Sequence, residues 1–304
     1  MFAPAHVQAL TGGRLHLSHG PIDIVLKAWG GSEARRAAYA RAGTRFASIL
    51  PELCDELAQL RTPLSAQPVL EGPVARRMLE ACQPFRGTFL TPMAAVAGAV
   101  ADELLAHMLE AAGLQRVFVN NGGDIAIFLA PGQALEVGIA GEFSRGNVPA
   151  LNGRLRLVAG MGVGGIATSG ARGRSFSLGI ADSVTVLGRT AAAADAAATL
   201  IANAVNVKSS AVSRRPARAL DPDSDLGDRL VTVAVGALSA AEITSALEAG
   251  LARASSYRRQ GLIIDAALML AGETRLLPAP QGSAGQRQTA RVLAQLLPSR
   301  RRDQ

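Results

Sequence analysis

The chain has 304 residues, of which 49% are hydrophobic and 18% are charged. This length and apolar share suit a globular protein with a substantial core, and they exclude a disordered or collagen-like chain. The net charge of +7 rests on arginine, because Lys27 and Lys208 are the only lysines. Arginine suits bidentate contacts with phosphates and carboxylates, so we expect an anionic small molecule as ligand.

Composition also bears on partners and location. A nucleic-acid surface would cluster basic residues among aromatics, but aromatics are 4% and the one dense basic run is at residues 300–302, so we expect no nucleic-acid partner. Residues 1–6 lack a secretory pattern and no apolar stretch reaches about 18 residues, so we expect a cytoplasmic protein without a membrane partner. Cys54 and Cys82 fall in separate predicted helices and are expected to be free thiols. The oligomeric state stays open, with a homo-oligomer among the alternatives.

The first third of the chain predicts a hairpin followed by helices. Residues 14–26 alternate apolar and polar around Gly20-Pro21, which is typical of a β-hairpin. Residues 32–60 have helical spacing and predict one long helix or two helices split at Pro51, and residues 73–81 predict another. Thr91 and Pro92 form a helix-start signal for a helix over residues 93–112. The small residues at 94–99 suit either a phosphate approaching the helix start or close packing of a second backbone.

The middle of the chain predicts strands joined by glycine-rich turns. A strand at 117–119 enters the run 120–124, which contains Asn121, Gly122, Gly123 and Asp124, and a second strand follows at 125–129. Asn-Gly indicates a hairpin, but five turn-type residues also suit a wider loop in which Asn121 and Asp124 contact a polar ring or ribose. Strands at 136–140 and 153–158 flank a polar loop, and a glycine-rich turn at 162–170 precedes a strand at 183–187. Arg172 and Arg174, beside that turn, are either phosphate contacts or plain surface arginines.

The last third predicts a charged loop, two strands and a helix. Residues 214–229 carry mixed charges and predict a salt-bridged lid, followed by a strand at 230–235. A helix at 239–254 is expected to be capped by Ser239, and a strand follows at 261–271. Helices and strands that interleave with hairpins predict an α+β fold. We expect residues 1–290 to form one domain, either single or made of two closely packed lobes, and residues 291–304 to form a basic tail.

Residues 190–205 are rich in alanine and strongly predict a helix, so their few polar side chains stand out. Asp195 and Thr199 are four residues apart and therefore lie on one face of that helix, where their oxygens could share a hard cation such as magnesium. The alternative is that both side chains cap or hydrogen-bond a buried helix. Spacing alone leaves the two readings open.

The order of these features resembles that of the ApbE superfamily, the FAD:protein FMN transferases, and more closely an uncharacterised family of shorter ApbE-like proteins. The features are the run 120–124, the turn 167–170, the Val-Thr-Val strand at 184–186 and the Ala-Asp-x-x-x-Thr helix at 194–199. The resemblance implies a two-lobed α+β fold with mixed or antiparallel sheets, distantly related to tunnelling folds. It also implies FAD as substrate or ligand and an acceptor protein as partner. The implied pocket residues are Asn121, Gly122, Gly123, Asp124, Thr168, Ser169 and Gly170, and the implied Mg²⁺ ligands are Asp195, Thr199 and a backbone carbonyl near Val96.

The chain departs from that superfamily at the transfer chemistry. The transferases carry a histidine between the Thr-Ser-Gly turn and the following strand, whereas the four histidines here are residues 6, 16, 19 and 107. Asp182 could replace it as the base, or it could simply cap the next strand. Three hypotheses follow: Mg²⁺-dependent transfer of FMN from FAD, a non-catalytic module that binds FAD or another nucleotide, and an enzyme acting on a small anionic metabolite.

Overall fold

A computed structural model describes residues 3–140, 151–173 and 175–278. Three predicted features lie outside these residues: the polar loop at 141–147, Arg174 and the basic tail at 291–304. The chain divides into two compact units. The first comprises Met1–Gln133, Val158–Ala167 and Leu187–Ala197, and the second comprises Ala134–Leu157, Thr168–Val186 and Ala198–Gln304. Helices and antiparallel strands occur in both, which confirms the α+β class.

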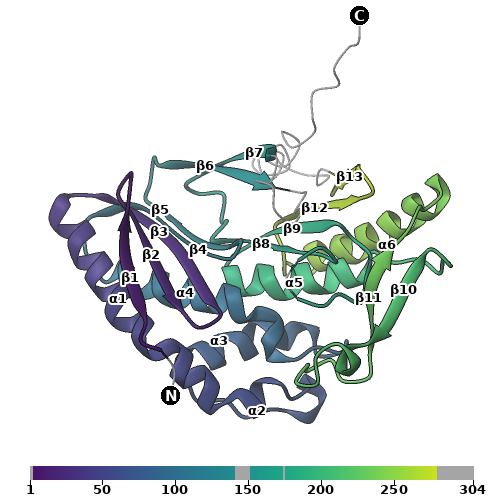
Figure 1. The fold of residues 1–304 in the computed structure, drawn as a ribbon. Helices are drawn as coiled ribbons and strands as arrows, with labels where there is room; N and C mark the ends of the chain where they lie inside the picture. Colours follow the sequence, from purple (N-terminus) through teal and green to yellow (C-terminus); the bar gives the residue numbers. More distant parts are fainter. Residues whose placement is uncertain (1–2, 141–150, 174, 279–304) are drawn as a thin grey trace, which may run out of the picture. The chain divides into compact units, whose positions relative to one another are not determined.

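The first unit is built on an antiparallel sheet (Figure 1). Its neighbouring strands pair antiparallel, and His19 pairs with Ile22 across a tight turn, which confirms the predicted hairpin. A strand before this hairpin was not predicted, and four of its five residues are exposed, so it has no buried face. The strands, in spatial order, are β1 (His6–Leu10), β2 (Arg14–His19), β3 (Ile22–Gly30), β4 (Leu114–Asn121), β5 (Asp124–Leu129) and β8 (Gly165–Ser169).

Two long helices, α1 (Ser32–Asp55) and α4 (Val96–Leu109), pack on each other and on the strands of this sheet (Figure 1). Helix α1 runs through Pro51, so of the two predicted alternatives the long helix is right and the split at that residue is wrong. Its apolar face continues across the proline, with Phe46, Leu50 and Leu53 buried, and this packing outweighs the one backbone hydrogen bond that proline removes. The remaining helical segments are α2 (Leu57–Leu60), η1 (Leu64–Ala66), α3 (Pro73–Cys82), η2 (Gln83–Phe85) and η3 (Pro92–Ala95).

The predicted helix start at Thr91 is partly right. Pro92 occupies the first helical position, but the first turn is the 3-10 helix η3 and the Thr91 side chain makes no capping bond. The α-helical part begins at Val96 and ends at Leu109, three residues before the predicted end.

One helical stretch of the described residues, Pro92–Leu109, is long and apolar enough to cross a membrane by length and composition alone. The prediction that no apolar stretch reaches this length is therefore wrong. Of its residues 56% are buried inside the protein, where α4 contacts α1, α3, β4 and β5. Packing in the core of the first unit therefore accounts for its apolar composition.

A buried carboxylate on α4 ties three helices of the first unit together. Glu103 is 3% exposed, and its two oxygens accept hydrogen bonds from the Nε atoms of Arg45 and Arg77, each at 2.8 Å. Arg45 also makes a bidentate pair with Glu52, at 2.7 Å for both bonds. Burial alone would raise the pKa of Glu103, but the two arginines lower it below its ordinary value. Glu103 is therefore held ionised, as a buried carboxylate must be paired to be tolerated.

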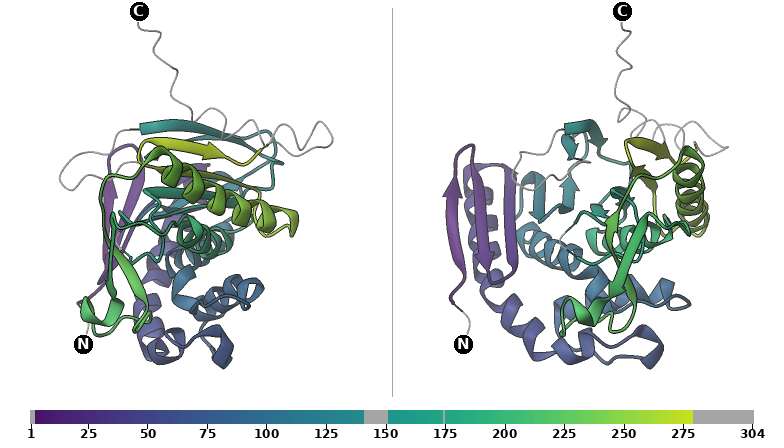
Figure 2. Two further views of the ribbon diagram at one scale, coloured as in Figure 1. Left: turned by 90° about the vertical axis from the view of Figure 1, so that its right-hand side faces the viewer. Right: turned by 45° about the vertical axis from the view of Figure 1, so that its right-hand side comes forward.

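The second unit contains short sheets and one long helix. Strand β9 (Ser183–Gly188) lies between β8 and β12 (Asp265–Leu270), and β13 (Glu273–Leu276) pairs with β12. Helix α6 (Ala240–Arg259) packs along β12 (Figure 2), and Ser239 with Glu242 forms a capping box at its start, as predicted for Ser239. The helix extends five residues past its predicted end. Two further strand pairs are β6 (Ala134–Ala140) with β7 (Leu151–Val158), and β10 (Val212–Pro216) with β11 (Leu230–Val235). The short helix η4 (Ala217–Ala219) follows β10 in the chain.

Asp265, the first residue of β12, gives the second unit a pH-sensitive stability. The residue is 3% exposed, and burial raises its pKa to about 7, although the Ala266 amide donates to it at 2.9 Å. A carboxyl whose pKa is raised on folding binds its proton more tightly in the folded state. Its stabilising contribution is therefore complete below about pH 4 and is lost as the pH rises toward 7.

We predict that Asp265→Asn raises the free energy of unfolding above pH 7, by up to about 4 kcal/mol, because the amide avoids the charge that burial penalises. The difference between variant and wild type should shrink toward zero as the pH falls to about 4. Urea unfolding followed by circular dichroism at several pH values measures it. Asp223→Asn, in an exposed loop of the same unit, is the matched control. A difference that is the same at pH 5 and pH 8 would contradict the prediction.

Candidate functional site

The candidate site is organised by the crossing of α4 with the start of α5 (Ala191–Ala204) in the first unit. The two backbones touch at Gly98. A Cβ atom at this position would lie 2.4 Å from the Ala191 carbonyl oxygen and 2.6 Å from the Ala192 nitrogen. No side chain fits there, so the small residues predicted at the helix start serve close backbone packing.

Each of the two helices supplies a carboxylate to the first turn of the other. Asp102 on α4 accepts hydrogen bonds from the Ala191 and Ala192 amides, at 3.0 and 2.8 Å. Asp195 on α5 accepts one from the Gly98 amide, at 3.0 Å. The first amides of a helix have no partner within it and carry the positive end of its dipole, so a carboxylate there is stabilising. This reciprocal capping fixes the crossing of α4 and α5.

The carboxylates at this crossing repel one another. Burial raises the pKa of Asp195 well above its ordinary value, and the nearby charges of Asp124 and Asp102 raise it further, while amide bonds from Gly98 and Ala97 oppose the rise. Asp195 is only half-buried as a whole residue, but its carboxylate group lies deep among protein atoms. Burial likewise raises the pKa of Asp102 to about 6. The positive charge of Arg77 lowers the pKa of Asp102, whereas the leading causes of the raised pKa of Asp195 are burial and the two neighbouring carboxylates.

The Asn-Gly-Gly-Asp run lies against the same helix start. Asn121 pairs directly with Asp124, so Gly122 and Gly123, both with positive φ, form a two-residue hairpin turn. The predicted wider loop is therefore wrong and the hairpin alternative is right. Asn121 is 6% exposed and its amide donates to the Ala97 carbonyl at 3.1 Å. The first unit thus brings Asn121, Asp124 and Asp195 to the start of α4, where Val96 is the first residue.

The turn predicted over residues 162–170 is wrong from Gly165 to Ser169, which form strand β8, and its Thr-Ser-Gly part belongs to the second unit. Thr168 and Ser169 are the last residues of β8, and Thr168 shares a hydroxyl hydrogen bond with Thr185 on β9 at 2.9 Å. A Cβ atom on Gly170 would lie 2.4 Å from the Asp182 carbonyl oxygen. Close packing therefore requires this glycine whether or not a ligand binds.

Both oxygens of Asp182, the predicted base, already accept hydrogen bonds in the second unit. Arg172 donates from Nε at 2.7 Å and the Ala271 amide donates at 2.6 Å. This arrangement favours the structural alternative for Asp182, and it uses one edge of the Arg172 guanidinium that was predicted to bind phosphate. The catalytic role of Asp182 and the phosphate role of Arg172 stay predictions.

Helix α5 continues into the second unit, and its later polar residues differ in role. Thr199 follows Asp195 by one helical turn. Asn203, a further turn along, accepts a hydrogen bond from the Leu178 amide at 2.9 Å and so anchors the segment after the Thr-Ser-Gly turn. Among the described residues no group of three or more His, Cys, Asp or Glu side chains could hold a metal ion. A cation at Asp195 would therefore need hydroxyl, carbonyl or water oxygens as further ligands.

Asp102 was not among the site residues predicted from the sequence, and the structure places it on the first amides of α5. The residues it bonds are 89 and 90 positions away in the sequence, so no local spacing reveals the contact. A carboxylate in a mostly apolar helix was the one available signal, and Glu103 shares it.

A sequence model of the family described as "AbpE bacteria" matches residues 7–276 of the chain. The chain belongs to this AbpE family. The match confirms the resemblance to ApbE proteins that the order of motifs indicated.

Two relatives with sequences similar to this chain are each called a UPF0280 protein. One from Methanothrix thermoacetophila is 42% identical over 134 residues, which is 44% of this chain and 52% of the relative. One from Methanothermobacter thermautotrophicus is 39% identical over 148 residues, which is 48% of this chain and 54% of the relative. The chain spans about half the length of the curated relatives it matches.

Two solved structures are similar at lower identity. The ApbE protein from Thermotoga maritima has 13% identity and a TM-score of 0.45, covering 91% of this chain and 97% of that one. The apo flavinyl transferase ApbE from Pseudomonas stutzeri has 12% identity and a TM-score of 0.40, covering 90% and 95%. At these values no residue role is transferred from either structure.

We predict that Gly98→Ala destabilises the protein by at least about 2 kcal/mol, because the new methyl group meets backbone atoms that cannot rotate away. The usual gain of about 1 kcal/mol for alanine over glycine within a helix is too small to offset this. Gly87→Ala is the control, since a Cβ there would meet nothing within 4 Å. Chemical unfolding of both variants tests this, and equal stabilities would contradict it.

We predict that Asp102→Ala lowers the free energy of unfolding by about 1 to 3 kcal/mol, because two buried amides of α5 lose their acceptor. Asp102→Asn keeps one acceptor oxygen and should fall between the alanine variant and wild type. The same unfolding measurement gives both values. An alanine variant as stable as wild type would show that the capping contributes nothing.

Proposed function

We propose that the chain is a flavin-nucleotide-binding protein that holds FAD with the help of Mg²⁺ at Asp195. The observation that carries the proposal is the gathering of the Asp195, Asp124 and Asp102 carboxylates in the first unit, where burial and the two neighbouring carboxylates raise the pKa of Asp195. Membership of the AbpE family supports a flavin ligand, because the ApbE protein of Pseudomonas stutzeri is called a flavinyl transferase.

The residues at this point suit a hard cation. The side chains of Asp195 and Asp124 offer carboxylate oxygens, and the backbone from Val96 to Gly98 offers carbonyl oxygens. A bound Mg²⁺ would supply positive charge that offsets the carboxylates and draws in a pyrophosphate. Thr199, one turn along α5, is our proposed hydroxyl ligand and Val96 our proposed carbonyl ligand.

The remaining proposed contacts are those of the nucleotide. Asn121 holds the start of α4 through the Ala97 carbonyl, so it positions the backbone that the nucleotide would meet. Our proposed nucleotide contacts are Gly122, Gly123, Asp124, Thr168, Ser169, Gly170, Arg172 and Arg174. An acceptor protein and a cytoplasmic location belong to the same proposal.

Binding without transfer is the better supported form of this function. Transfer of FMN forms a bond between the flavin phosphate and an acceptor hydroxyl, breaks the pyrophosphate bond and requires a group to take the hydroxyl proton. Asp182 already accepts bonds from Arg172 and the Ala271 amide, and histidine is absent from residues 171–182. We therefore rank the non-catalytic module above the FMN transferase, and both above an enzyme for another anionic metabolite.

Isothermal titration of metal-free protein with FAD tests the proposal. We expect FAD to bind in the presence of Mg²⁺ and to bind at least tenfold more weakly without it, a difference of roughly 1.4 kcal/mol in binding free energy. Asp195→Asn keeps an acceptor for the Gly98 amide but removes the charge, so its FAD affinity should no longer depend on Mg²⁺. Asp55→Asn, exposed on α1, is the control and should behave as wild type.

Two outcomes would contradict the proposal: no heat on adding FAD with or without Mg²⁺, or an unchanged Mg²⁺ dependence in a folded Asp195→Asn variant. Release of AMP during the titration would instead reverse the ranking of binding module and transferase.

A further inference from the structure

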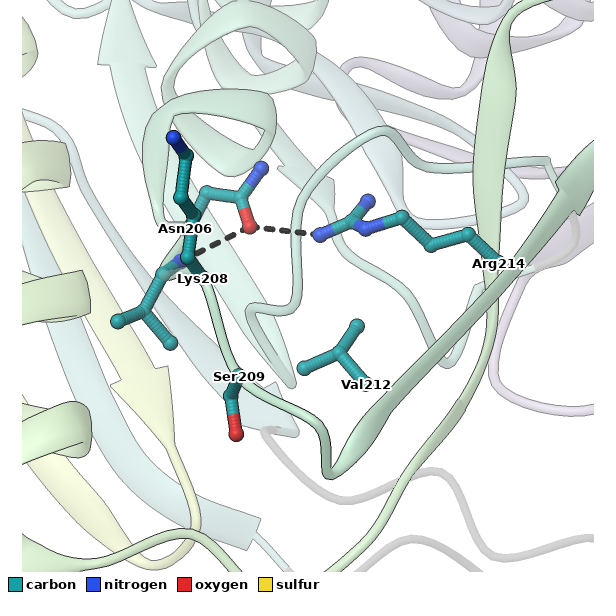
Figure 3. A pocket seen from close by; sticks show the side chains of 6 residues that line it. Asn206, Lys208, Ser209, Val212 and Arg214 are labelled. Carbon is teal, nitrogen blue, oxygen red and sulfur yellow. Dashed lines mark hydrogen bonds between the residues drawn. The ribbon is translucent and has the colours of Figure 1, made fainter.

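A pocket of the second unit, separate from the residues assigned above, has two basic and no acidic side chains among its lining residues. It has a volume of about 490 Å³ and is lined by Asn206, Val207, Lys208, Ser209, Val212 and Arg214. These residues come from the segment after α5 and from strand β10, and Figure 3 shows Arg214 reaching from the strand toward Asn206. The volume falls in the range of small-molecule sites.

Arg214 is fixed in this pocket by neutral groups. Its Nη1 donates to the Leu178 carbonyl at 2.6 Å and to the Thr232 hydroxyl at 3.0 Å, and its Nη2 donates to the Asn206 side-chain oxygen at 2.6 Å. Within the described residues, no carboxylate forms an ion pair with it. Burial lowers the pKa of Arg214, and no acidic group opposes that effect. The protein thus holds a partly desolvated guanidinium without a counter-ion.

Two of the five N–H donors of Arg214 are left over after these three bonds. Lys208 is exposed and has no ion-pair partner among the described residues, and its flexible stem lets the ammonium group reach a ligand at the pocket mouth. The Ser209 hydroxyl is engaged, because it accepts from the Ala211 amide and bonds Glu242 on α6. Arg214 and Lys208 are therefore the groups available to a ligand.

We propose that this pocket is an anion site that binds the phosphate or carboxylate group of a small molecule through Arg214 and Lys208. A guanidinium whose plane is already fixed loses little conformational freedom when it binds an oxyanion, and charge-assisted hydrogen bonds of this kind are strong. Val207 and Val212 add apolar walls for the rest of such a molecule. The site does not depend on the flavin-nucleotide proposal, because it shares no residue with it.

The alternative is that Arg214 only ties the Leu178 segment, the α5 exit and the β10–β11 pair together. That role explains the three hydrogen bonds of Arg214. It does not explain why Arg214 has no carboxylate partner among the described residues or why a second basic residue, Lys208, lines the same pocket. It also predicts that loss of Arg214 affects stability alone.

Isothermal titration with inorganic phosphate, and separately with acetate, at constant ionic strength distinguishes the two. We expect at least one of these anions to bind wild type, Lys208→Gln to weaken that binding roughly tenfold and Arg214→Gln to abolish it. Arg215→Gln is the matched control, because Arg215 is the exposed neighbour on the same strand, and it should bind as wild type. Circular dichroism verifies that each variant is folded, and Lys208→Gln, which removes no internal bond, keeps the test valid if Arg214→Gln unfolds.

Binding of phosphate shows that the site accepts phosphate groups, and binding of acetate shows that it accepts carboxylates. Binding of neither, or affinities that are equal in wild type, Lys208→Gln and Arg215→Gln, would overturn the proposal. Asp195→Asn should bind the anion as wild type does, so failure of the flavin-nucleotide proposal and failure of this one are distinguishable.

Discussion

The reciprocal capping of α4 and α5 is the interaction on which the first unit depends. Two helices can approach this closely only where one of them has no side chain, and Gly98 provides that point. The first backbone amides of each helix have no partner within that helix. Because the two helices lie so close, Asp102 and Asp195 accept hydrogen bonds from these amides of the opposite helix. The arrangement stabilises the crossing and at the same time concentrates negative charge among buried atoms.

That concentration links the fold to the proposed function. A carboxylate that only caps a helix gains from the helix dipole, whereas Asp195 also lies near Asp124 and Asp102, and burial and these two charges raise its pKa. Glu103, on the same helix as Asp102, shows the opposite solution, with an arginine on each of its oxygens. Because Glu103 forms ion pairs with two arginines and Asp195 forms none with a basic side chain of the described residues, we propose the cation at Asp195.

Local patterns predicted the elements that local forces determine. The β2–β3 hairpin, the alanine-rich α5 and the capping box of α6 followed from alternation, propensity and the Ser-Glu spacing. Long-range packing decided the rest. Helix α1 passes through Pro51 because its buried face continues, and the partners of Asp102 and Arg214 lie far away in sequence. The family resemblance located Asp195 and Thr199 as candidates, but only the structure shows that Asp195 also caps α4 and that Asp182 is already bonded.

Anomalous diffraction from crystals grown with Mn²⁺ and FAD tests the central claim most directly, because Mn²⁺ takes the oxygen ligands that suit Mg²⁺ and scatters anomalously. The account predicts a manganese peak about 2.2 Å from an Asp195 carboxylate oxygen, beside the pyrophosphate of the bound FAD. A structure with FAD bound and no manganese at Asp195 would contradict it, and Asp195 would then be a helix cap alone.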